Sequence, residues 1–503
     1  MQLLLSIALP LILIIYLIQK RRNPKNTLAP PGPRGLPFIG NLHQFAATTD
    51  QHVYLWKLSR KHGPVMQMKL GSVPLLVVSS AESAREVLKS QDLAFCSRPK
   101  LLGQQRLSYN ASDMVFAPYG DYWKEVRKIT SIHLFSIRKT QSFRPIREDE
   151  VSRMLAKIRA SGSEQPEARV VNLSAVAMAL SSTLICRVAF GKIYDEHGAE
   201  MRRFDRFSRE AQELMATFYV SDYFPSFGWI DKLTGLMDRL EKVFWDLDSF
   251  YEELIEEHRN RRERAAEEDE DVLGVLIKLK EENSSSVELG WDQIKALLMN
   301  IFIAATDTTT VSIVWTMTAL MKAPTVMKKV QAEIRNLIGE NGKLDEGDLP
   351  NLPYLKAVIK ETLRLYPPAP LLVPRQTIEK CTLEGYEIQP NTVVFVNAWA
   401  VARDPKYWEN PDEFMPERFL NSNIHDITGQ DFGAIPFGSG RRICPGMSMG
   451  LANMELTVAS LLYNFDWEMP EGIKAQDIDT DTVPGITMHK KNPLILVARD
   501  YVA

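Results

Sequence analysis

Apolar residues recur at helical spacing along most of the chain. This spacing, or a helix-favouring composition, predicts helices over residues 81–88, 171–190, 237–264, 291–321 and 324–338. Two strands are predicted between Val65 and Val78, separated by Gly71 and Ser72, and shorter β-rich pieces follow near residues 383–388, 392–396 and 494–497. Helix dominates and no linker follows Gly40. The pattern therefore predicts one large α+β domain, mainly α with small sheets, over residues 41–503.

The N-terminal segment has a different pattern. Residues 3–18 are apolar apart from Ser6, and eighteen helical residues from Met1 span roughly 27 Å, close to the hydrocarbon thickness of a bilayer. A cleaved secretory signal is the alternative, but a basic n-region and an A-x-A-like cleavage site are both missing. We predict a transmembrane signal-anchor over residues 1–19.

A basic and proline-rich hinge is predicted over residues 20–40. It begins with four basic residues and continues into a Pro-Pro-Gly-Pro run: Lys20, Arg21, Arg22, Lys25 and Pro30–Pro33. Positive charge after the apolar run places the rest of the chain in the cytosol. Prolines at this density favour a stiff extended connector, which would orient the domain against the membrane.

Composition excludes several classes of protein. The 503 residues carry a formal charge of -3, which is no basic signature of a nucleic-acid binder. Cys96, Cys186, Cys381 and Cys444 lie far apart without a C-x-x-C pair, which excludes a disulfide scaffold and disfavours a metal cluster. The eight histidines show no metal-ligand spacing, so we interpret them all as hydrogen-bonded or exposed. No P-loop, H-E-x-x-H or G-x-S-x-G motif occurs.

The strongest local signal is the glycine-rich segment Phe437–Gly446. Cys444 stands just before a helix-like stretch, where amide N–H groups and the helix dipole favour a thiolate. Arg442 lies two residues away and can meet an anionic cofactor edge. Such a loop suits a single soft axial ligand to haem iron. A glycine-rich turn around a buried cysteine is the alternative.

This segment, F-x-x-G-x-R-x-C-x-G, resembles the haem-ligand signature of the cytochrome P-450 superfamily. The resemblance implies haem b, with Cys444 as the axial ligand to its iron and Phe437 among the cofactor-binding residues. It implies the cytochrome P-450 fold, preceded by the transmembrane helix. The overall sequence resembles that of the microsomal plant A-type clan, and short stretches are similar to members that metabolise aldoximes.

Two further motifs resemble the family's scaffold and cofactor motifs. Glu361 and Arg364 form E-x-x-R, and Arg418 lies in a Pro-Glu-Arg-Phe run, so the resemblance implies a buried structural triad of these three residues. Trp123 and Arg127 form W-x-x-x-R. By resemblance these two side chains, together with Arg375 and Arg442, serve the haem propionates.

The polar group at residues 306–309 interrupts an apolar helix. The run Ala304–Thr309 resembles the family's oxygen-activation motif, which implies that Thr308 hydrogen-bonds dioxygen or its water and that Asp307 relays protons. Threonine hydroxyls bonded to carbonyls four residues earlier are the local alternative. Ala305 stands where the family usually has glycine, which adds a methyl group beside the oxygen groove.

By resemblance, six positions line the substrate pocket: Phe116, Phe218, Phe302, Ala304, Leu372 and Ile486. They are apolar, so a small hydrophobic or aromatic ligand is expected. The resemblance as a whole implies a monooxygenase at the endoplasmic reticulum membrane that oxidises a plant specialised metabolite. Dioxygen and NADPH-derived electrons would serve as co-substrates, with a flavoprotein reductase and cytochrome b5 as partners and no nucleic acid. An oxygen-independent haem-thiolate isomerase or dehydratase, and a membrane-tethered haem sensor, remain as alternatives.

Overall fold

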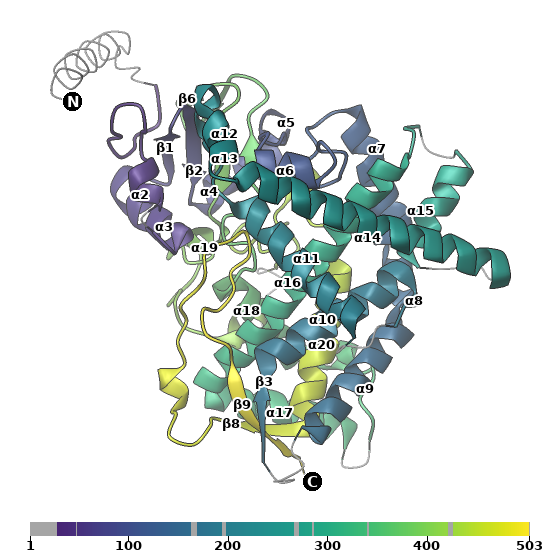
Figure 1. The fold of residues 1–503 in the computed structure, drawn as a ribbon. Helices are drawn as coiled ribbons and strands as arrows, with labels where there is room; N and C mark the ends of the chain where they lie inside the picture. Colours follow the sequence, from purple (N-terminus) through teal and green to yellow (C-terminus); the bar gives the residue numbers. More distant parts are fainter. Residues whose placement is uncertain are drawn as a thin grey trace.

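The computed structural model describes residues 28–46, 48–161, 168–193, 198–265, 271–283, 286–339, 342–420 and 426–501. These residues form a helix-rich body with three small sheets, as predicted (Figure 1). The predicted anchor, residues 1–19, and residues 20–27 of the predicted hinge lie outside the described residues.

The helices and single helical turns follow in chain order. They are α2 (Leu42–Ala46), α3 (Gln51–His62), α4 (Ala81–Arg85), η1 (Glu86–Ser90), α5 (Asp92–Phe95), α6 (Leu102–Leu107), α7 (Asp121–Ile129), η2 (Thr130–Leu134), α8 (Ile137–Ser142), α9 (Arg144–Ala160), α10 (Leu173–Phe190), α11 (Ala199–Ala216), α12 (Val220–Tyr223), η3 (Pro225–Phe227), α13 (Trp229–Leu233), α14 (Leu236–Ala265), α15 (Val272–Glu281), α16 (Trp291–Lys322), α17 (Pro324–Ile338), η4 (Leu349–Asn351), α18 (Pro353–Leu365), α19 (Ala398–Val401), η5 (Pro416–Phe419), η6 (Gly440–Arg442), α20 (Met447–Asn464) and η7 (Ala475–Asp477).

The strands form three separate sheets. The first has the order β1 (Val65–Leu70), β2 (Val73–Val78), β7 (Val393–Val396) and β4 (Arg375–Gln376); the second has β3 (Arg169–Asn172), β9 (Ile495–Asp500) and β8 (Phe465–Glu468); the third pairs β5 (Cys381–Leu383) with β6 (Tyr386–Ile388). Within the described ranges, only β2 and β7 pair in parallel. The first sheet lies at the upper left of Figure 1 and the second at the bottom, beside the C-terminus.

Most predicted elements are present, with corrections at their ends. The two strands predicted between Val65 and Val78 pair in antiparallel fashion around Gly71, whose φ of +59° glycine tolerates. The β-rich run near residues 383–388 is a hairpin, because the chain reverses at Glu384 and Gly385. The helix predicted from residue 171 begins at Leu173, because the preceding residues pair with β9. Its N-cap is Asn172, which accepts the Ala175 N–H at 3.0 Å.

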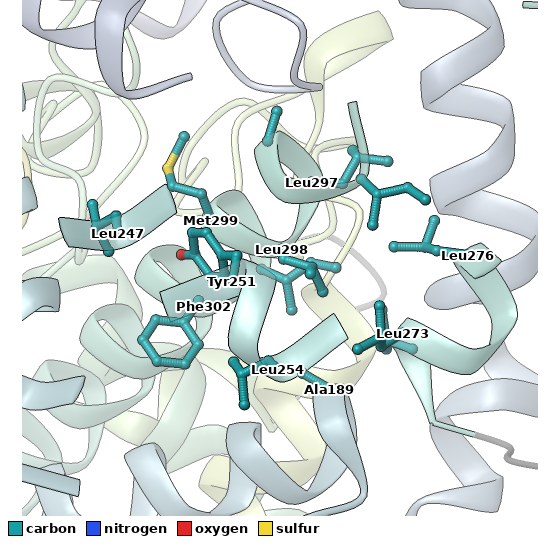
Figure 2. Packing of buried hydrophobic residues seen from close by; sticks show 14 of the residues in the cluster. Ala189, Leu247, Tyr251, Leu254, Leu273, Leu276, Leu297, Leu298, Met299 and Phe302 are labelled. Atoms are coloured by element: carbon teal, nitrogen blue, oxygen red, sulfur yellow. The ribbon is translucent and has the colours of Figure 1, made fainter. Parts of the chain in front are cut away.

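Helix α16 is the central element and packs against α10, α18 and α20. Both α10 and α16 are long and apolar enough to span a membrane, but they pack mostly inside the protein. Figure 2 shows the cluster in which residues of α16, such as Leu297 and Phe302, meet residues of α14 and α15, such as Tyr251 and Leu276. This packing holds α16 rigidly, so the few positions it leaves open are well defined.

Candidate active site

The loop before α20 is folded tightly around Cys444. The Cys444 N–H donates to the Phe437 carbonyl at 3.0 Å, which closes the loop. Gly440 has a φ of +69°, and a Cβ there would lie 1.8 Å from the Leu88 carbonyl oxygen, so no larger residue fits against η1. The loop therefore holds Cys444 in one place, three residues before α20 begins.

The thiol of Cys444 faces an internal space. Cys444 is exposed by surface area, whereas burial raises the pKa of its thiol, and both are expected when the open surface lies inside the protein. The Gly446 backbone and Arg127 oppose this rise in pKa because they favour the thiolate. Cys96 and Cys186 are buried and Cys381 is half-buried. Cys444 is therefore the cysteine whose position fits a single thiolate bond to iron.

Buried arginines gather beside this loop. The guanidinium groups of Arg98, Arg375 and Arg442 interact electrostatically with one another, and Arg127 interacts with both Arg442 and Cys444. Burial, which is the largest cause, lowers the pKa of Arg375 to about 10 and of Arg442 to about 9. Arg375 is 3% exposed, and among the described residues its Nη1 has no hydrogen-bond partner. Asp113 opposes the charge of Arg98 and Arg442, and Asp92 that of Arg375. The unpartnered Nη1 of Arg375 still offers a donor to a further anion, so these residues fit the two carboxylates of haem.

The four predicted propionate-binding residues divide into two pairs. Arg375 and Arg127 keep donors available: Arg375 donates to the Ser439 carbonyl at 3.2 Å, and Arg127 makes a weak contact with the Met114 sulfur at 3.8 Å. The donors of Trp123 and Arg442 instead reach main-chain carbonyls. The Trp123 indole N–H donates to Met114 at 3.0 Å.

Arg442 is the centre of a separate set of contacts. Its guanidinium donates to the carbonyls of Cys96, Met114 and Ala117 at 2.9, 3.3 and 2.7 Å, and it lies 4.1 Å from the Trp123 ring centroid. The single N–H of Trp123 is thus used by a main-chain carbonyl, and its contact with a propionate stays a prediction. Arg442 uses three of its five N–H donors on the chain. Both side chains fix the loop before α7 against the cysteine loop.

The sequence interpretation missed Arg98. Its guanidinium donates to the Val115 carbonyl at 2.8 Å and to the Val373 and Pro374 carbonyls at 2.7 Å. Burial, followed by repulsion from Arg442 and Arg375, holds its pKa well below the usual range. The sequence signal is weak: Arg98 follows the short apolar run Leu93–Cys96 after one serine, and the residues that surround it come from distant parts of the chain.

Glu361, Arg364 and Arg418 meet in the interior. Arg364 donates to both Glu361 carboxylate oxygens at 2.7 and 2.8 Å, and Arg418 donates to one of them at 3.3 Å. The side chains of Glu361 and Arg364 are fully buried. Arg364 also donates to the carbonyls of Ala402, Pro411 and Glu413, so the pair ties α18 to the segment that leads to η5.

Helix α16 leaves a narrow stripe open on an otherwise buried surface. Ala304 is exposed and Thr308 is half-buried, and residues four apart share a helix face. The Thr308 hydroxyl donates to the Ala304 carbonyl at 2.6 Å, which is the local alternative noted from the sequence. The hydroxyl oxygen can still accept a hydrogen bond from the open side. Ala305 packs at the rim of the same apolar cluster as Ile486.

Asp307 has a partner that the sequence interpretation did not foresee. Asp307 is 3% exposed, and its Oδ1 lies 2.6 Å from Nε2 of His489. His489 is hydrogen-bonded, which agrees with the sequence interpretation of the histidines, but its partner is a residue of the candidate site. This contact joins residues 182 positions apart, so spacing along the chain could not reveal it.

The six predicted pocket residues do not all share one space. Leu372 and Ile486 line a cleft of about 100 Å³ together with Pro370, Leu371 and Phe395. Leu372 also adjoins the cysteine loop, with its Cδ1 3.8 Å from the position of a Cβ on Gly438. Phe116 is buried in the cluster at whose rim Ala305, Val373 and Ile486 pack. Leu372 and Ile486 thus share one cleft, while Phe116 and Ile486 belong to or pack against the cluster that Ala305 of α16 also contacts.

Phe302 and Phe218 were predicted to line the pocket, but the structure places both elsewhere. Phe302 is 2% exposed and belongs to the buried cluster in Figure 2, with its ring 6.2 Å from that of Phe190. It is two residues from Ala304, about 200° around the helix, and so points away from the open stripe. Phe218 is 47% exposed and stacks on Tyr223 at 4.7 Å. Apolar character alone could not distinguish these two from cavity residues.

The cysteine loop, the arginines beside it and the open stripe of α16 together have the features of a haem-thiolate protein. The family model for cytochrome P450 matches residues 30–497. A 6,7,8-trihydroxycoumarin synthase of Pastinaca sativa is 47% identical over 99% of this chain and 98% of its own length, and a 5-OH-xanthotoxin synthase of Ammi majus is 46% identical over the same shares. A zebra fish cytochrome P450 solved with progesterone is 25% identical with a TM-score of 0.76, covering 89% of this chain and 99% of that one.

The chain belongs to the cytochrome P450 family, and the predicted likeness to its plant A-type members is confirmed. It is a haem-dependent monooxygenase that uses dioxygen and NADPH-derived electrons, so the predicted fold, enzyme class and cofactors are confirmed. The family receives its electrons from a reductase partner and acts on a small substrate.

Proposed function

We propose that the enzyme hydroxylates a planar aromatic oxygen heterocycle of the coumarin class, a plant specialised metabolite. The names of the two plant relatives support this substrate class. The observation that carries the proposal is the open Ala304–Thr308 stripe, whose neighbour Ala305 packs with Val373 and Ile486 against the apolar cluster that contains Phe116. A flat, weakly polar ring system would bury its faces against such a lining. The earlier likeness to aldoxime-metabolising members stays a prediction.

Each residue around the site has a separate role in this reaction. When bound, haem would supply the iron at which dioxygen is activated with two electrons and two protons, so that one oxygen atom enters the substrate and the other leaves as water. Cys444 would ligate the iron as a thiolate and donate electron density to it, which favours O–O cleavage. Arg127 and Arg375 would hold the haem carboxylates. Thr308 would hold a water molecule or proton at the open face, and Asp307 would deliver protons to it. Apolar residues at Leu372 and Ile486 would keep bulk water out.

A substrate panel tests the proposed class. The purified enzyme, a flavoprotein reductase and NADPH would be supplied separately with simple coumarins, furanocoumarins, terpenes and aldoximes. We expect coumarins to shift the haem absorption band and to yield a product heavier by one oxygen atom. Turnover restricted to terpenes or aldoximes would overturn the substrate class without affecting the monooxygenase assignment.

Thr308→Ala is expected to leave haem content and substrate binding intact, since neither depends on the hydroxyl. It should lower product formed per NADPH and release more hydrogen peroxide, because a positioned proton donor is typically worth about 10²–10⁴-fold in rate. Ala305→Gly should widen the groove and alter this yield without loss of the Cys444 ligand. The measurement is product, peroxide and NADPH consumption in one assay.

Thr310→Ala is the matched control for Thr308→Ala. Thr310 makes the same type of hydrogen bond, to the Thr306 carbonyl at 2.8 Å, but it is buried on the side of α16 that faces α10. Its replacement should leave the product yield near that of the wild type. An unchanged yield in Thr308→Ala would contradict the proposed role of Thr308.

We also propose that the protein is a single-pass protein of the endoplasmic reticulum membrane with its catalytic domain in the cytosol. Six exposed apolar residues, here called the apolar patch, support a membrane-facing surface: Leu36, Phe38, Ile39, Phe227, Trp229 and Leu233. The two segments of the patch are neighbours, because the β1–β2 turn bonds to both: Gly71 N–H donates to Ile39 and Ser72 N–H donates to Tyr223. In Figure 1, α12 and α13 lie beside β1 and β2. Cytochrome b5 is proposed as a second electron donor.

Deletion of residues 1–22 is expected to leave a folded haem domain that binds membranes more weakly, since the candidate site lies beyond it. The remaining binding should depend on the apolar patch, so Trp229→Glu with Leu233→Glu should lower it further. Trp245→Glu, which changes an exposed tryptophan on α14, is the control. Vesicle flotation measures binding, and failure of the truncated protein to take up haem would contradict the division into anchor and domain.

A further inference from the structure

Asp307 sits in a pocket of polar groups built from three separate elements. It lies on α16, three residues after the exposed Ala304 and therefore on a neighbouring face of the helix, yet it is 3% exposed. His489 covers it from the C-terminal segment, and Gln212 covers it from α11. A carboxylate this deeply buried requires partners, and these two side chains supply them.

The geometry assigns the direction of the hydrogen bonds. An ionised carboxylate only accepts, so Nε2 of His489 carries the proton and donates to Oδ1 at 2.6 Å. The Gln212 amide satisfies its neighbours when its nitrogen faces Asp307, at 3.2 Å from Oδ1 and 3.3 Å from Oδ2. Oδ1 therefore accepts hydrogen bonds from both side chains, whereas Oδ2 accepts one from Gln212.

His489 is carried by a hairpin over residues 481–491. Val483 N–H donates to the His489 carbonyl at 3.1 Å, and Lys491 N–H donates to Asp481 at 2.8 Å. Its tip-side arm is fixed to the body next to His489, because Met488 N–H donates to Pro368 and the Trp315 indole N–H donates to Met488. Its tip carries Ile486, which lines the cleft and packs against the same apolar cluster as Ala305 of α16. One rigid hairpin thus contacts both the cavity and the buried carboxylate.

We propose that His489 is a positioning residue for Asp307: it holds the carboxylate in the orientation from which protons pass to the open face of α16. This inference rests on the proposed role of Asp307. Without His489, Oδ1 would keep only the longer contact from Gln212, and the side chain could rotate or recruit water. Substrate binding would be spared, whereas the fraction of NADPH that ends in product would fall.

Variants of His489 and of Asp307 test the proposal in the full-length enzyme with its reductase. The first two are at position 489. His489→Leu removes the donor, and His489→Gln keeps an N–H at a similar distance from the backbone. We expect His489→Leu to lower product per NADPH about tenfold, because it removes a hydrogen bond to a charged group. The substrate-induced absorption shift should give an unchanged dissociation constant. His489→Gln should recover most of the product yield.

A double-mutant cycle separates positioning from general damage. Asp307→Asn alone should lower the yield at least as much as His489→Leu, and adding His489→Leu to it should change the yield by less than about twofold. Lys491→Leu, an exposed position on the same hairpin, is the control and should leave the yield unchanged. Hydrogen exchange of the amides of residues 481–491 gives a readout independent of turnover. Exchange should quicken in His489→Leu and in Asp307→Asn, and should return towards wild type in His489→Gln.

Each result has one meaning. A wild-type yield in His489→Leu, a failure of His489→Gln to restore it, or a full additional loss on the Asp307→Asn background would overturn the positioning role. Unchanged exchange in both His489→Leu and Asp307→Asn would show that the pair does not hold the hairpin, and would also overturn it. If Asp307→Asn itself keeps the wild-type yield, the proposed proton delivery by Asp307 fails instead.

Discussion

Cys444→Ala is expected to abolish the thiolate-type absorption spectrum with carbon monoxide and all turnover with NADPH and reductase. Cys444 is the cysteine whose thiol opens into the interior space, while Cys96 and Cys186 are fully buried. An alanine leaves the loop geometry intact, because the hydrogen bond that closes the loop runs from the main-chain N–H to Phe437. The loss would therefore report the missing ligand rather than a collapsed loop.

Cys381→Ala is the matched control for this prediction. Cys381 is half-buried on β5, and burial raises the pKa of its thiol to about 11. Unlike Cys444, it has among the described residues no backbone hydrogen bond or arginine that opposes this rise. Its replacement should leave the carbon monoxide spectrum and the rate unchanged. A thiolate-type spectrum that survives in Cys444→Ala would mean that another cysteine ligates the iron.

Glu361→Gln is expected to prevent accumulation of folded, haem-loaded protein. The carboxylate of Glu361 is fully buried and is the shared acceptor of Arg364 and Arg418. It also accepts the Met415 N–H at 2.9 Å. Loss of its charge leaves two guanidinium groups without their anion, and breaking a buried ion pair costs about 3–5 kcal/mol. Haem content and the thermal unfolding temperature measure the effect.

Glu417→Gln is the control. It makes the same glutamate-to-glutamine change at a residue of η5 that directly precedes Arg418. Glu417 pairs with Lys329 at 2.7 Å where both side chains reach solvent, and exposed pairs contribute about 0–1 kcal/mol. We expect a small change in the unfolding temperature and normal haem content. A Glu361→Gln protein as stable as Glu417→Gln would contradict the structural role of the triad.

Much of the candidate site was predictable because its residues are close together in the sequence. The cysteine loop and the Glu361–Arg364 pair are local, since a tight turn or one helical turn brings their members together. The strands on either side of Gly71 and the long helices α16 and α17 were predictable for the same reason: the apolar period and the turn residues act over a few positions. The likeness of the motifs then indicated the family and its cofactor.

The tertiary structure decided which side chains face the site and which partners they have. Phe302 and Phe218 are apolar like Ile486, but one lies on the far side of α16 and the other at the surface. Trp123 and Arg442 bind carbonyls of a loop that folds back over them, and Arg98 joins the arginines from a separate segment. His489 reaches Asp307 from 182 residues away. A pattern along the chain sets the face and period of each element, whereas these contacts depend on how distant elements pack, so only the folded chain determines them.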